Sequence, residues 1–164
     1  KLNFMGNELA EYKEWDEKKS LGWVLLKYPQ HDSFHRYFRD LNHIIKEHPA
    51  LYQYDYYPEG FEWLVVDDYQ QSVFAYARYA PNGDTLICVM NFVGNSHKGY
   101  RIPVPTQGTY KEIINSDTDY YTGNNFVNKR AIRAKKVPAV NKNYSIAIDI
   151  APFSGMIFEL KKKK

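Results

Sequence analysis

The chain has 164 residues, of which 44% are hydrophobic and 16% aromatic, so it is long enough for one domain or for one domain plus part of another. Its net charge of +3 includes the four lysines Lys161 to Lys164, which leaves the rest of the chain close to neutral. This balance excludes the clustered cations that a nucleic-acid interface needs. No apolar stretch of membrane-spanning length and no basic-then-apolar leader is present, so we expect neither a membrane partner nor a signal peptide.

The single cysteine indicates the redox environment in which the protein is expected to act. Cys88 lies in the apolar run Leu86 to Met90, which excludes a disulfide framework and predicts a buried thiol. We therefore expect a reducing, cytoplasmic setting.

The first fifteen residues combine an apolar run with an acidic loop. The run Leu2 to Met5 stops at Gly6, a residue that turns a strand end, and is interpreted as a buried strand. Glu8, Glu11 and Glu14 follow it, as does Trp15. In α/β barrels the carboxyl ends of strands carry the chemistry, but spacing alone also fits a strand followed by a solvated acidic loop.

One helix is predicted from His31 to His48, after a loop that contains Trp23. Its apolar residues recur every three to four positions: Phe34, Phe38, Leu41, Ile44 and Ile45. Asp32 or Ser33 is expected to cap its start, and Pro49 follows its end.

After the turn-rich connector at residues 53–60 the periodicity changes to alternation. We predict a domain boundary there, with domains at residues 1–52 and 61–164. Several short strands with turns between them are typical of an antiparallel β-sandwich. The predicted strands are Phe61 to Val66, Ser72 to Tyr79, Thr85 to Phe92, Gly99 to Ile102, Thr109 to Asn115, Ser145 to Ile150 and Met156 to Leu160.

Two loops of the β region have their own signals. Pro81 to Asp84 is typical of a hairpin, because Asn-Gly tolerates the positive φ values of tight turns. Residues 116–143 are expected to run over the surface, with little regular structure in their first half.

Most motifs that carry chemistry are missing. His31 and His35 share a helix face but lack a third ligand, and Asp117 and Asp119 with Asn115 fit a turn better than a calcium loop. No Gly-rich phosphate loop, Gly-x-Ser-x-Gly or Cys-His pair is present, so no cofactor and no metal is expected. Glycoside chemistry uses two carboxylates, but those of the acidic loop lack separate rigid supports, which favours substrate contact over catalysis.

With these elements in order, the chain resembles the C-terminal third of bacterial glycogen (1,4-α-glucan) branching enzymes of the α-amylase superfamily. The residues that carry the resemblance are Leu2 to Glu8, Glu14-Trp15, Ser20-Leu21, Trp23, Leu25-Leu26, Arg39 to Asn42, Gly60 to Leu64, Asn91-Phe92, Tyr100-Arg101 and Asn115 to Asp117. The chain departs from the family pattern at Leu9, where Phe is common, and at Gly22, where Asp is usual.

The resemblance implies a mainly β fold, with residues 1–52 as the last strand, catalytic-face loop and final helix of a (β/α)₈ barrel. It implies cleavage of α-1,4-glucan with retention and transfer to a 6-hydroxyl, in glycogen synthesis. The catalytic aspartate, glutamate and second aspartate of the family lie on earlier strands, so no catalytic residue is expected here. Glu8, Trp15 and Trp23 are expected at the active-site rim.

A second hypothesis is a carbohydrate-binding or structural β-sandwich. The aromatic residues that would stack on glucose rings are Tyr56, Tyr57, Trp63, Tyr69, Tyr120 and Tyr121. Alternation within its strand predicts that Trp63 packs in the core instead. An RNA-binding sandwich is disfavoured, because the nearly neutral body lacks a basic stripe.

The apolar helix face around Phe34 and Phe38 needs a partner once the rest of a barrel is missing. We expect it to pack on the sandwich, to mediate self-association, or to be disordered. If the face is buried, Phe38→Ala is expected to cost about 3–5 kcal/mol.

Overall fold

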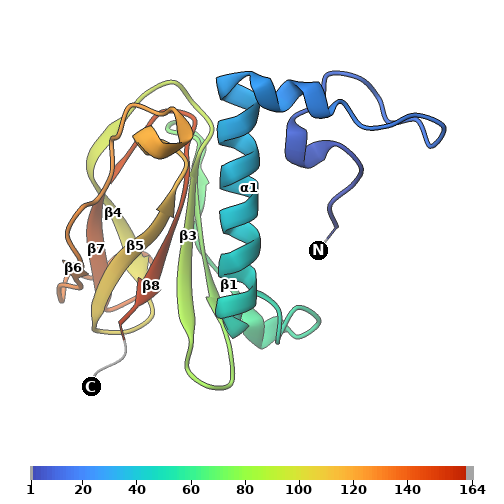
Figure 1. Ribbon diagram of the computed structural model, residues 1–164. Coiled ribbons are helices and arrows are strands. Elements are labelled where there is room, and N and C mark those ends of the chain that lie inside the picture. The colour runs from blue at the N-terminus through green and yellow to red at the C-terminus, as the bar shows by residue number, and fades with distance from the viewer. Residues whose placement is uncertain (1, 162–164) are drawn as a thin grey trace.

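A computed structural model describes residues 2–161, in which one long helix lies between a β-sandwich and an irregular N-terminal segment (Figure 1). The helix is α1 (Pro29–Glu47), and the strands are β1 (Phe61–Asp68), β2 (Val73–Tyr79), β3 (Thr85–Asn91), β4 (His97–Val104), β5 (Thr109–Asn115), β6 (Ile132–Arg133), β7 (Tyr144–Ile150) and β8 (Gly155–Leu160). Five short 3-10 helices complete the described elements: η1 (Asn7–Leu9), η2 (Trp23–Lys27), η3 (Pro49–Leu51), η4 (Pro58–Gly60) and η5 (Asp119–Tyr121).

The strands form two layers. A six-stranded sheet has the order β1-β2-β3-β8-β5-β6, and β4 pairs with β7 in a second, two-stranded sheet. All of these pairs are antiparallel, so the predicted antiparallel β-sandwich is confirmed. Every predicted strand of the β region is found within two residues of its expected ends, and the two-residue β6 was not predicted.

The main core lies between the two layers. Phe158 and Tyr110 from the larger sheet are fully buried against a cluster that includes Ile146 and Ile148 from β7. Alternation explains this arrangement, because every second residue of a strand faces the same side. The apolar residues that alternate along the predicted strands therefore face the interior of the sandwich.

The turns of the β region also match expectation. Residues 80–84 close the β2–β3 hairpin, and Gly83 takes the positive φ of 79° that its turn requires. In the predicted surface excursion, residues 116–131 contain only η5. The Asp117 carboxylate accepts hydrogen bonds from the backbone N–H groups of Asn124 and Phe126, so this side chain organises a turn, as predicted.

Helix α1 starts two residues earlier than predicted. Pro29 occupies its first position, where a missing N–H costs nothing, and Tyr28 precedes it without a side-chain cap. The expected capping by Asp32 or Ser33 is wrong, because both residues lie inside the helix. Ser33 Oγ instead donates to the Gln30 carbonyl oxygen at 2.9 Å.

The inner side of α1 covers part of the outer face of the six-stranded sheet. Ile44 is buried, and Leu41 and Ile45 pack with it against a cluster that contains Leu86 of β3 and Ile157 of β8. Of the three expected fates of the apolar helix face, packing on the sandwich is the one found for these residues. Burying each such side chain contributes about 1.5–3 kcal/mol to folding.

Polar contacts hold both halves of α1 to the sheet. Tyr121 donates its hydroxyl to Asp40 Oδ2 at 2.8 Å, and burial, with Asp40 as a second cause, raises the pKa of Tyr121. Beyond the end of the helix, His48 Nδ1 donates to Asp84 Oδ1 at 3.2 Å, while Asp84 Oδ2 accepts the Ala50 N–H at 3.1 Å. The helix and the sheet are thus joined at η5 and at the β2–β3 hairpin.

Cys88 lies on the outer face of β3. It is 5% exposed, and burial raises the pKa of its thiol to about 11. The predicted buried thiol is confirmed.

The N-terminal segment differs from expectation. Leu2 to Met5 form no strand, and Leu2 is 89% exposed. A strand needs a neighbour for its backbone hydrogen bonds, and within residues 2–161 none lies beside this run. The Asn7 N–H instead closes a turn on the Phe4 carbonyl oxygen at 3.0 Å.

Two core truncations are expected to differ in cost. Phe158→Ala should lower the free energy of unfolding by about 3–5 kcal/mol, because it leaves a cavity between the layers. Phe38→Ala should cost clearly less, because the Phe38 ring is only partly buried. Urea denaturation followed by circular dichroism measures both, and an equal loss in the two variants would contradict the burial described.

Candidate functional site

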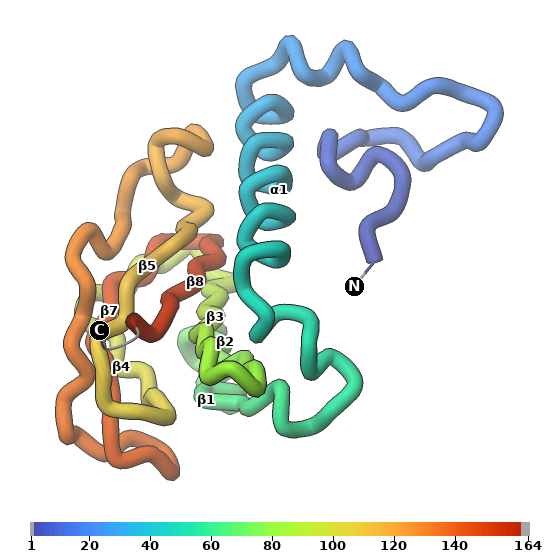
Figure 2. Tube along the Cα trace, turned by 60° about the horizontal axis from the view of Figure 1, so that its bottom comes forward, coloured from blue at the N-terminus to red at the C-terminus, as the bar shows by residue number. Residues whose placement is uncertain are grey.

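The N-terminal segment is held on the side of α1 that faces away from the sandwich (Figure 2). His31 Nδ1 donates to the Leu9 carbonyl oxygen at 2.7 Å, and His35 Nδ1 donates to the Glu8 carbonyl oxygen at 3.3 Å. The two histidines are four residues apart and so share a helix face. This pair, considered above as metal ligands, serves as two backbone anchors.

The local backbone explains why the segment turns back at this point. Gly6 has a φ of 86°, in the left-handed region that glycine adopts without strain, and Ala10 has a φ of 51° at the other end of η1. Leu9 lies between them with its side chain fully buried. This single buried anchor and the two histidines fix Glu8 beside α1.

Glu11 closes the loop that follows. Its Oε1 accepts the Gly22 N–H at 3.1 Å across eleven residues. A Cβ at Gly22 would lie 2.7 Å from Glu11 Oε1, so a side chain at residue 22 would displace this carboxylate from its present position.

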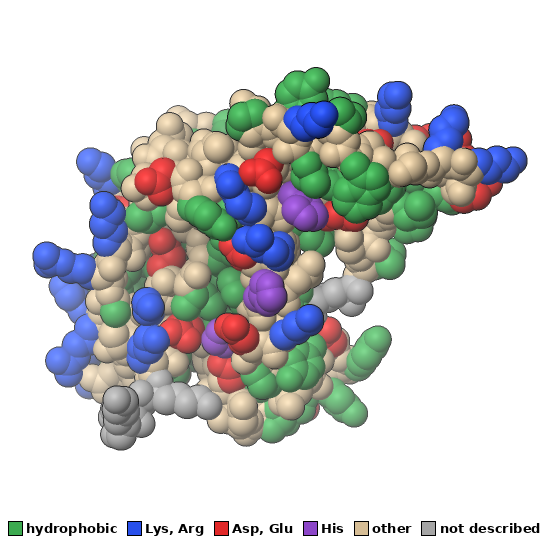
Figure 3. Space-filling view, in the orientation of Figure 1, with side chains coloured by type: hydrophobic (Ala, Val, Ile, Leu, Met, Phe, Trp, Pro, Cys, Tyr) green, Lys and Arg blue, Asp and Glu red, His purple; other side chains and the backbone are tan. Residues whose placement is uncertain are grey.

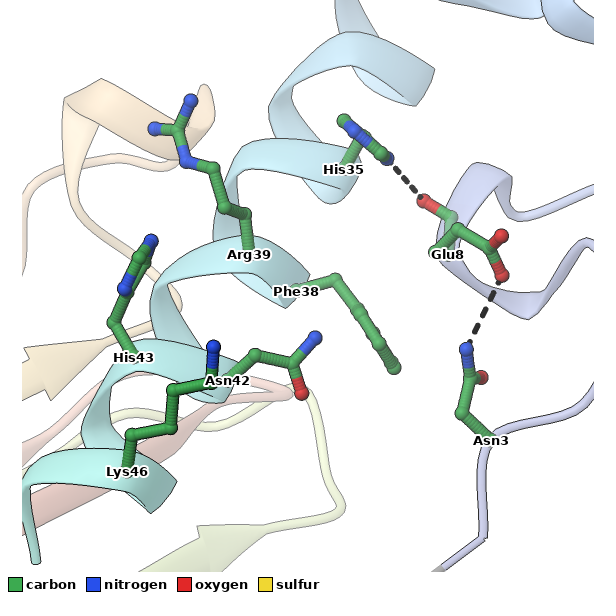
Figure 4. Close-up of a pocket in the computed structure, with 8 residues that line it drawn as sticks. All are labelled: Asn3, Glu8, His35, Phe38, Arg39, Asn42, His43 and Lys46. Carbon is green, nitrogen blue, oxygen red and sulfur yellow. Dashed lines mark hydrogen bonds between the residues drawn. The ribbon is translucent and has the colours of Figure 1, made fainter.

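The three expected rim residues do not converge in this structure. Glu8 lines a groove against α1, and its Oε2 accepts from Asn3 Nδ2 at 3.2 Å (Figure 4). Trp15 lines a separate hollow with residues 11–22 and contacts Phe4 edge-on at 5.0 Å. Trp23 lines neither and is 54% exposed.

The groove beside Glu8 has an open volume of about 370 Å³, and Arg39 and Lys46 are the cations among the residues that line it. Its helix side, which the sequence reasoning did not single out as a site, consists of His35, Phe38, Arg39, Asn42, His43 and Lys46. The spacing of three and four residues was the available signal, because it places these side chains on one helix face. Figure 3 shows His, Lys and Arg side chains gathered over α1 in the same region.

This groove does not support glycoside chemistry by itself. Glu8 is its only carboxylate among the residues that line it, and a retaining mechanism needs two carboxyl groups about 5–5.5 Å apart. The arrangement can contact a polar ligand. The described part of the chain supplies no catalytic pair there.

The candidate stacking residues fall into two groups. Tyr56 is 96% exposed, Tyr57 59% and Tyr69 82%, so their rings are accessible. Tyr120 and Tyr121 are engaged with α1, because Arg39 donates to the Tyr120 hydroxyl at 3.1 Å and Tyr121 binds Asp40.

The expectation that Trp63 packs in the core is wrong. Its side chain is 50% exposed, on the outer face of edge strand β1. Alternation places Leu64 toward the core and Trp63 with Phe61 on the opposite face. Phe61, Phe74 and Phe92, which the sequence did not indicate as site residues, surround this tryptophan or continue its surface.

Over residues 2–161, no three His, Cys, Asp or Glu side chains stand close enough to hold a metal ion. Within the same range, α1 and the shorter helices include none with the length and apolar character needed to cross a membrane.

Known proteins are similar to this chain over most of its sequence. The family model described as alpha amylase, C-terminal all-beta domain, matches residues 63–161. A 1,4-alpha-glucan branching enzyme of Nitrosococcus oceani is 42% identical over 161 residues, which are 98% of this chain and 21% of that protein. The enzyme of the same description from Pseudomonas putida is 38% identical over 97% of this chain and 22% of its own length. The chain thus spans about a fifth of these curated relatives.

Solved structures share the fold. The catalytic module of the multi-modular glycogen-degrading pneumococcal virulence factor SpuA superposes with a TM-score of 0.56 at 12% identity, over 88% of this chain and 20% of that one. A Group B Streptococcus pullulanase superposes with a TM-score of 0.52 at 13% identity, over 86% and 18%. The mainly β fold class and the resemblance found in the sequence are confirmed.

Glu11 is expected to control the order of the loop at residues 11–22. Glu11→Ala removes the acceptor for Gly22, so the Gly22 amide should exchange with solvent faster, while the β-sandwich amides keep their rates. Gly22→Asp should act in the same direction, because it places a second carboxylate against the first. Hydrogen exchange measures both variants.

Glu17→Ala is the matched control, since Glu17 is exposed on the same loop. Unchanged Gly22 exchange in Glu11→Ala would show that the contact does not hold the loop.

Proposed function

Since the chain belongs to the family of alpha-amylase C-terminal all-beta domains, we propose that it is the C-terminal part of a 1,4-α-glucan branching enzyme that acts in glycogen synthesis. The observation that carries this proposal is the near-complete match to two enzymes of that description, at 42% and 38% identity. The match includes the N-terminal segment and α1, which lie outside the residues of the β-domain model.

We propose that residues 1–52 are the end of a catalytic barrel, residues 53–60 a connector, and residues 61–164 the all-β domain. Contacts with β2 hold the end of the first part and the connector in place. Arg78 of β2 donates to the Ala50 carbonyl oxygen at 3.1 Å and forms an ion pair with Asp55. These contacts tie the end of the first part to the sheet.

The chemistry of branching sets what this part contributes. Retaining transfer uses one carboxyl group as the nucleophile and a second as the acid and base, on opposite sides of the scissile bond. Glu8 accepts a hydrogen bond from the Asn3 amide, and no second carboxyl group lies among the residues that line its groove. The catalytic carboxylates are therefore assigned to the part of the relatives that this chain does not span.

Glu8, Trp15 and Trp23 are proposed to line the active-site rim and to contact the α-glucan. Trp15 and Trp23 are about half exposed, as substrate-stacking rings must be. Their separation in this structure fits a rim that other barrel loops complete. The buried Cys88 thiol also fits the proposed cytoplasmic location.

The complete protein should branch amylose, which lowers the iodine absorbance and creates linkages that a debranching enzyme cleaves. The 164-residue chain alone should show no branching activity. Turnover by the chain alone would overturn the assignment of the catalytic carboxylates to the missing part.

Rim residues can be tested in the complete protein. Trp15→Ala and Glu8→Gln should lower kcat/KM by up to about a hundredfold, since loss of substrate positioning costs that much. Val140→Ala is a control, because Val140 is exposed in the β6–β7 loop of the sandwich. Kinetics unchanged in both rim variants would reject the rim role.

A second candidate function is glucan binding by the chain as a carbohydrate-binding module, which the exposure of Tyr56 and Tyr57 in the connector favours. A stacking platform presents neighbouring ring faces to successive glucose units. The Tyr57 ring meets Tyr54 at 72°, so these two neighbours do not form a flat platform. This geometry makes the second candidate weaker than the first.

Titration of the chain with maltoheptaose separates the two candidates. We expect no saturable change in tyrosine and tryptophan fluorescence at millimolar ligand. Saturable binding that Tyr56→Ala or Tyr57→Ala weakens several-fold, and that Tyr12→Ala leaves unchanged, would favour the binding platform. Tyr12 is the matched control because it is 87% exposed on the N-terminal segment.

A further inference from the structure

Cations gather in one part of the chain, although its overall charge is nearly balanced. Residues 97–150 contain nine Lys and Arg but only four Asp and Glu. Apart from Lys161 to Lys164, the rest of the chain has nine Lys and Arg against fifteen Asp and Glu. Figure 3 shows Lys and Arg side chains along the edge of the molecule where Figure 1 places β6 and β7. The near-neutral total therefore conceals a local excess of positive charge.

The segment around β6 directs its cations to the surface. Ile132 packs against the core between the two layers, and Ala134 is buried in that core. Because side chains alternate along an extended chain, Arg133 and Lys135 point to the outside, and both are exposed.

Strand β7 brings a further cation to the same surface. Lys135 pairs with Ser145 of β7, and residues directly opposite each other in an antiparallel pair share a face. Arg101 of β4 donates to Ser145 Oγ at 3.0 Å. The Arg101 guanidinium group therefore lies on the outer face at the position that Lys135 reaches from the other side.

A side-chain clamp fixes the start of this segment. Asn128 Nδ2 donates to the Asp149 carbonyl oxygen at 2.9 Å, and Asn128 Oδ1 accepts the Asp149 N–H at 2.9 Å. Residues 128–135 thus follow β7 from Asp149 to Ser145. We name the exposed cations of this surface the cationic strip: Arg101, Lys129, Arg130, Arg133, Lys135 and Lys136.

The carboxylates of the same region do not neutralise the cationic strip. Asp149 Oδ1 accepts the Gly99 N–H at 2.8 Å, and Glu112 Oε2 accepts from Asn128 Nδ2 at 2.8 Å. Among residues 2–161, no carboxylate forms an ion pair with a member of the strip. Neighbouring like charges repel one another, so an anionic partner would be attracted to this surface.

The spacing of the cations fits an extended acidic polypeptide. Arg133 and Lys135 are two residues apart on an extended segment, which separates them by about 7 Å. An extended partner chain presents every second side chain to one side at the same repeat. The guanidinium groups of the strip can each hold a carboxylate with two hydrogen bonds.

Other anionic partners fit this surface less well. Within residues 97–104, 128–136 and 144–150, all of which the structure describes, no aromatic ring is exposed for a nucleic-acid base to stack on. The exposed apolar residues beside the strip, Ala131 and Ala147, are too small to anchor the surface in a lipid layer. An α-glucan carries no charge for the strip to recognise.

We propose that the cationic strip is a docking surface for an extended acidic segment of a partner protein. The strip lies on the second layer of the sandwich and the segment beside it, away from α1 and the N-terminal segment (Figure 1). The inference does not depend on the proposed branching activity.

Fluorescence anisotropy with the complete protein tests this proposal. The probe is a labelled peptide of alternating Glu and Ser, and a peptide of alternating Gln and Ser is its neutral counterpart. Every protein used lacks Lys162 to Lys164, so that the terminal lysines do not bind the probe. The acidic peptide should bind saturably at low salt, about 50 mM, and the neutral peptide should not bind.

Paired substitutions locate the binding. Arg133→Gln with Lys135→Gln should weaken peptide binding by about five- to tenfold, because two exposed ion pairs are lost. Lys18→Gln with Lys27→Gln is the matched control, since it removes the same charge from exposed positions outside the strip and should leave binding unchanged. If the first variant fails to fold, Lys129→Gln with Arg130→Gln, before β6, supplies the same test.

Three results would overturn the proposal. Absence of saturable binding, or equal weakening in the strip variant and the control, would show that the strip does not dock an acidic chain. Tighter binding of a single-stranded oligonucleotide of equal charge would show a nucleic-acid surface instead. Binding to vesicles that contain phosphatidylglycerol, without binding of the peptide, would show a lipid surface.

Discussion

The burial of α1 against the outer face of the six-stranded sheet is the contact on which the remaining structure depends. Ile44 and its neighbours Leu41 and Ile45 supply the apolar area, while Leu86 and Ile157 receive it from the sheet. Removing this contact would expose apolar surface on both the helix and the sheet. The N-terminal segment is held against the other side of α1 through His31 and His35.

The sequence predicted the β-sandwich and the helix well, because both depend on periodicity. A residue such as Phe158 has the same inward direction in any sheet of this pattern, and Ile44 lies on the apolar side of any helix drawn through residues 31–48. The hairpin at Gly83 followed from turn chemistry. The family was predicted from the order of several short motifs, none of which is specific alone.

The errors have a common physical origin, since they concern contacts that the local sequence does not contain. Leu2 to Met5 have the composition of a strand, but a strand forms only beside a partner. Trp63 alternates correctly, but alternation does not say which face of an edge strand another element covers. Likewise, the spacing of Glu8, Trp15 and Trp23 in the sequence could not show that Glu8 and Trp15 line different hollows and that Trp23 lines neither.

Asp84 connects the end of α1 to the sheet. One carboxylate joins the hairpin of the sheet to His48 and to the Ala50 amide beyond the end of α1, so the end of the helix is fixed to the sheet. Four turns away, the same helix carries the histidines that locate Glu8. The sandwich therefore sets the orientation of the segment proposed as a rim, and a substitution at the β2–β3 hairpin can displace Glu8 without contacting it.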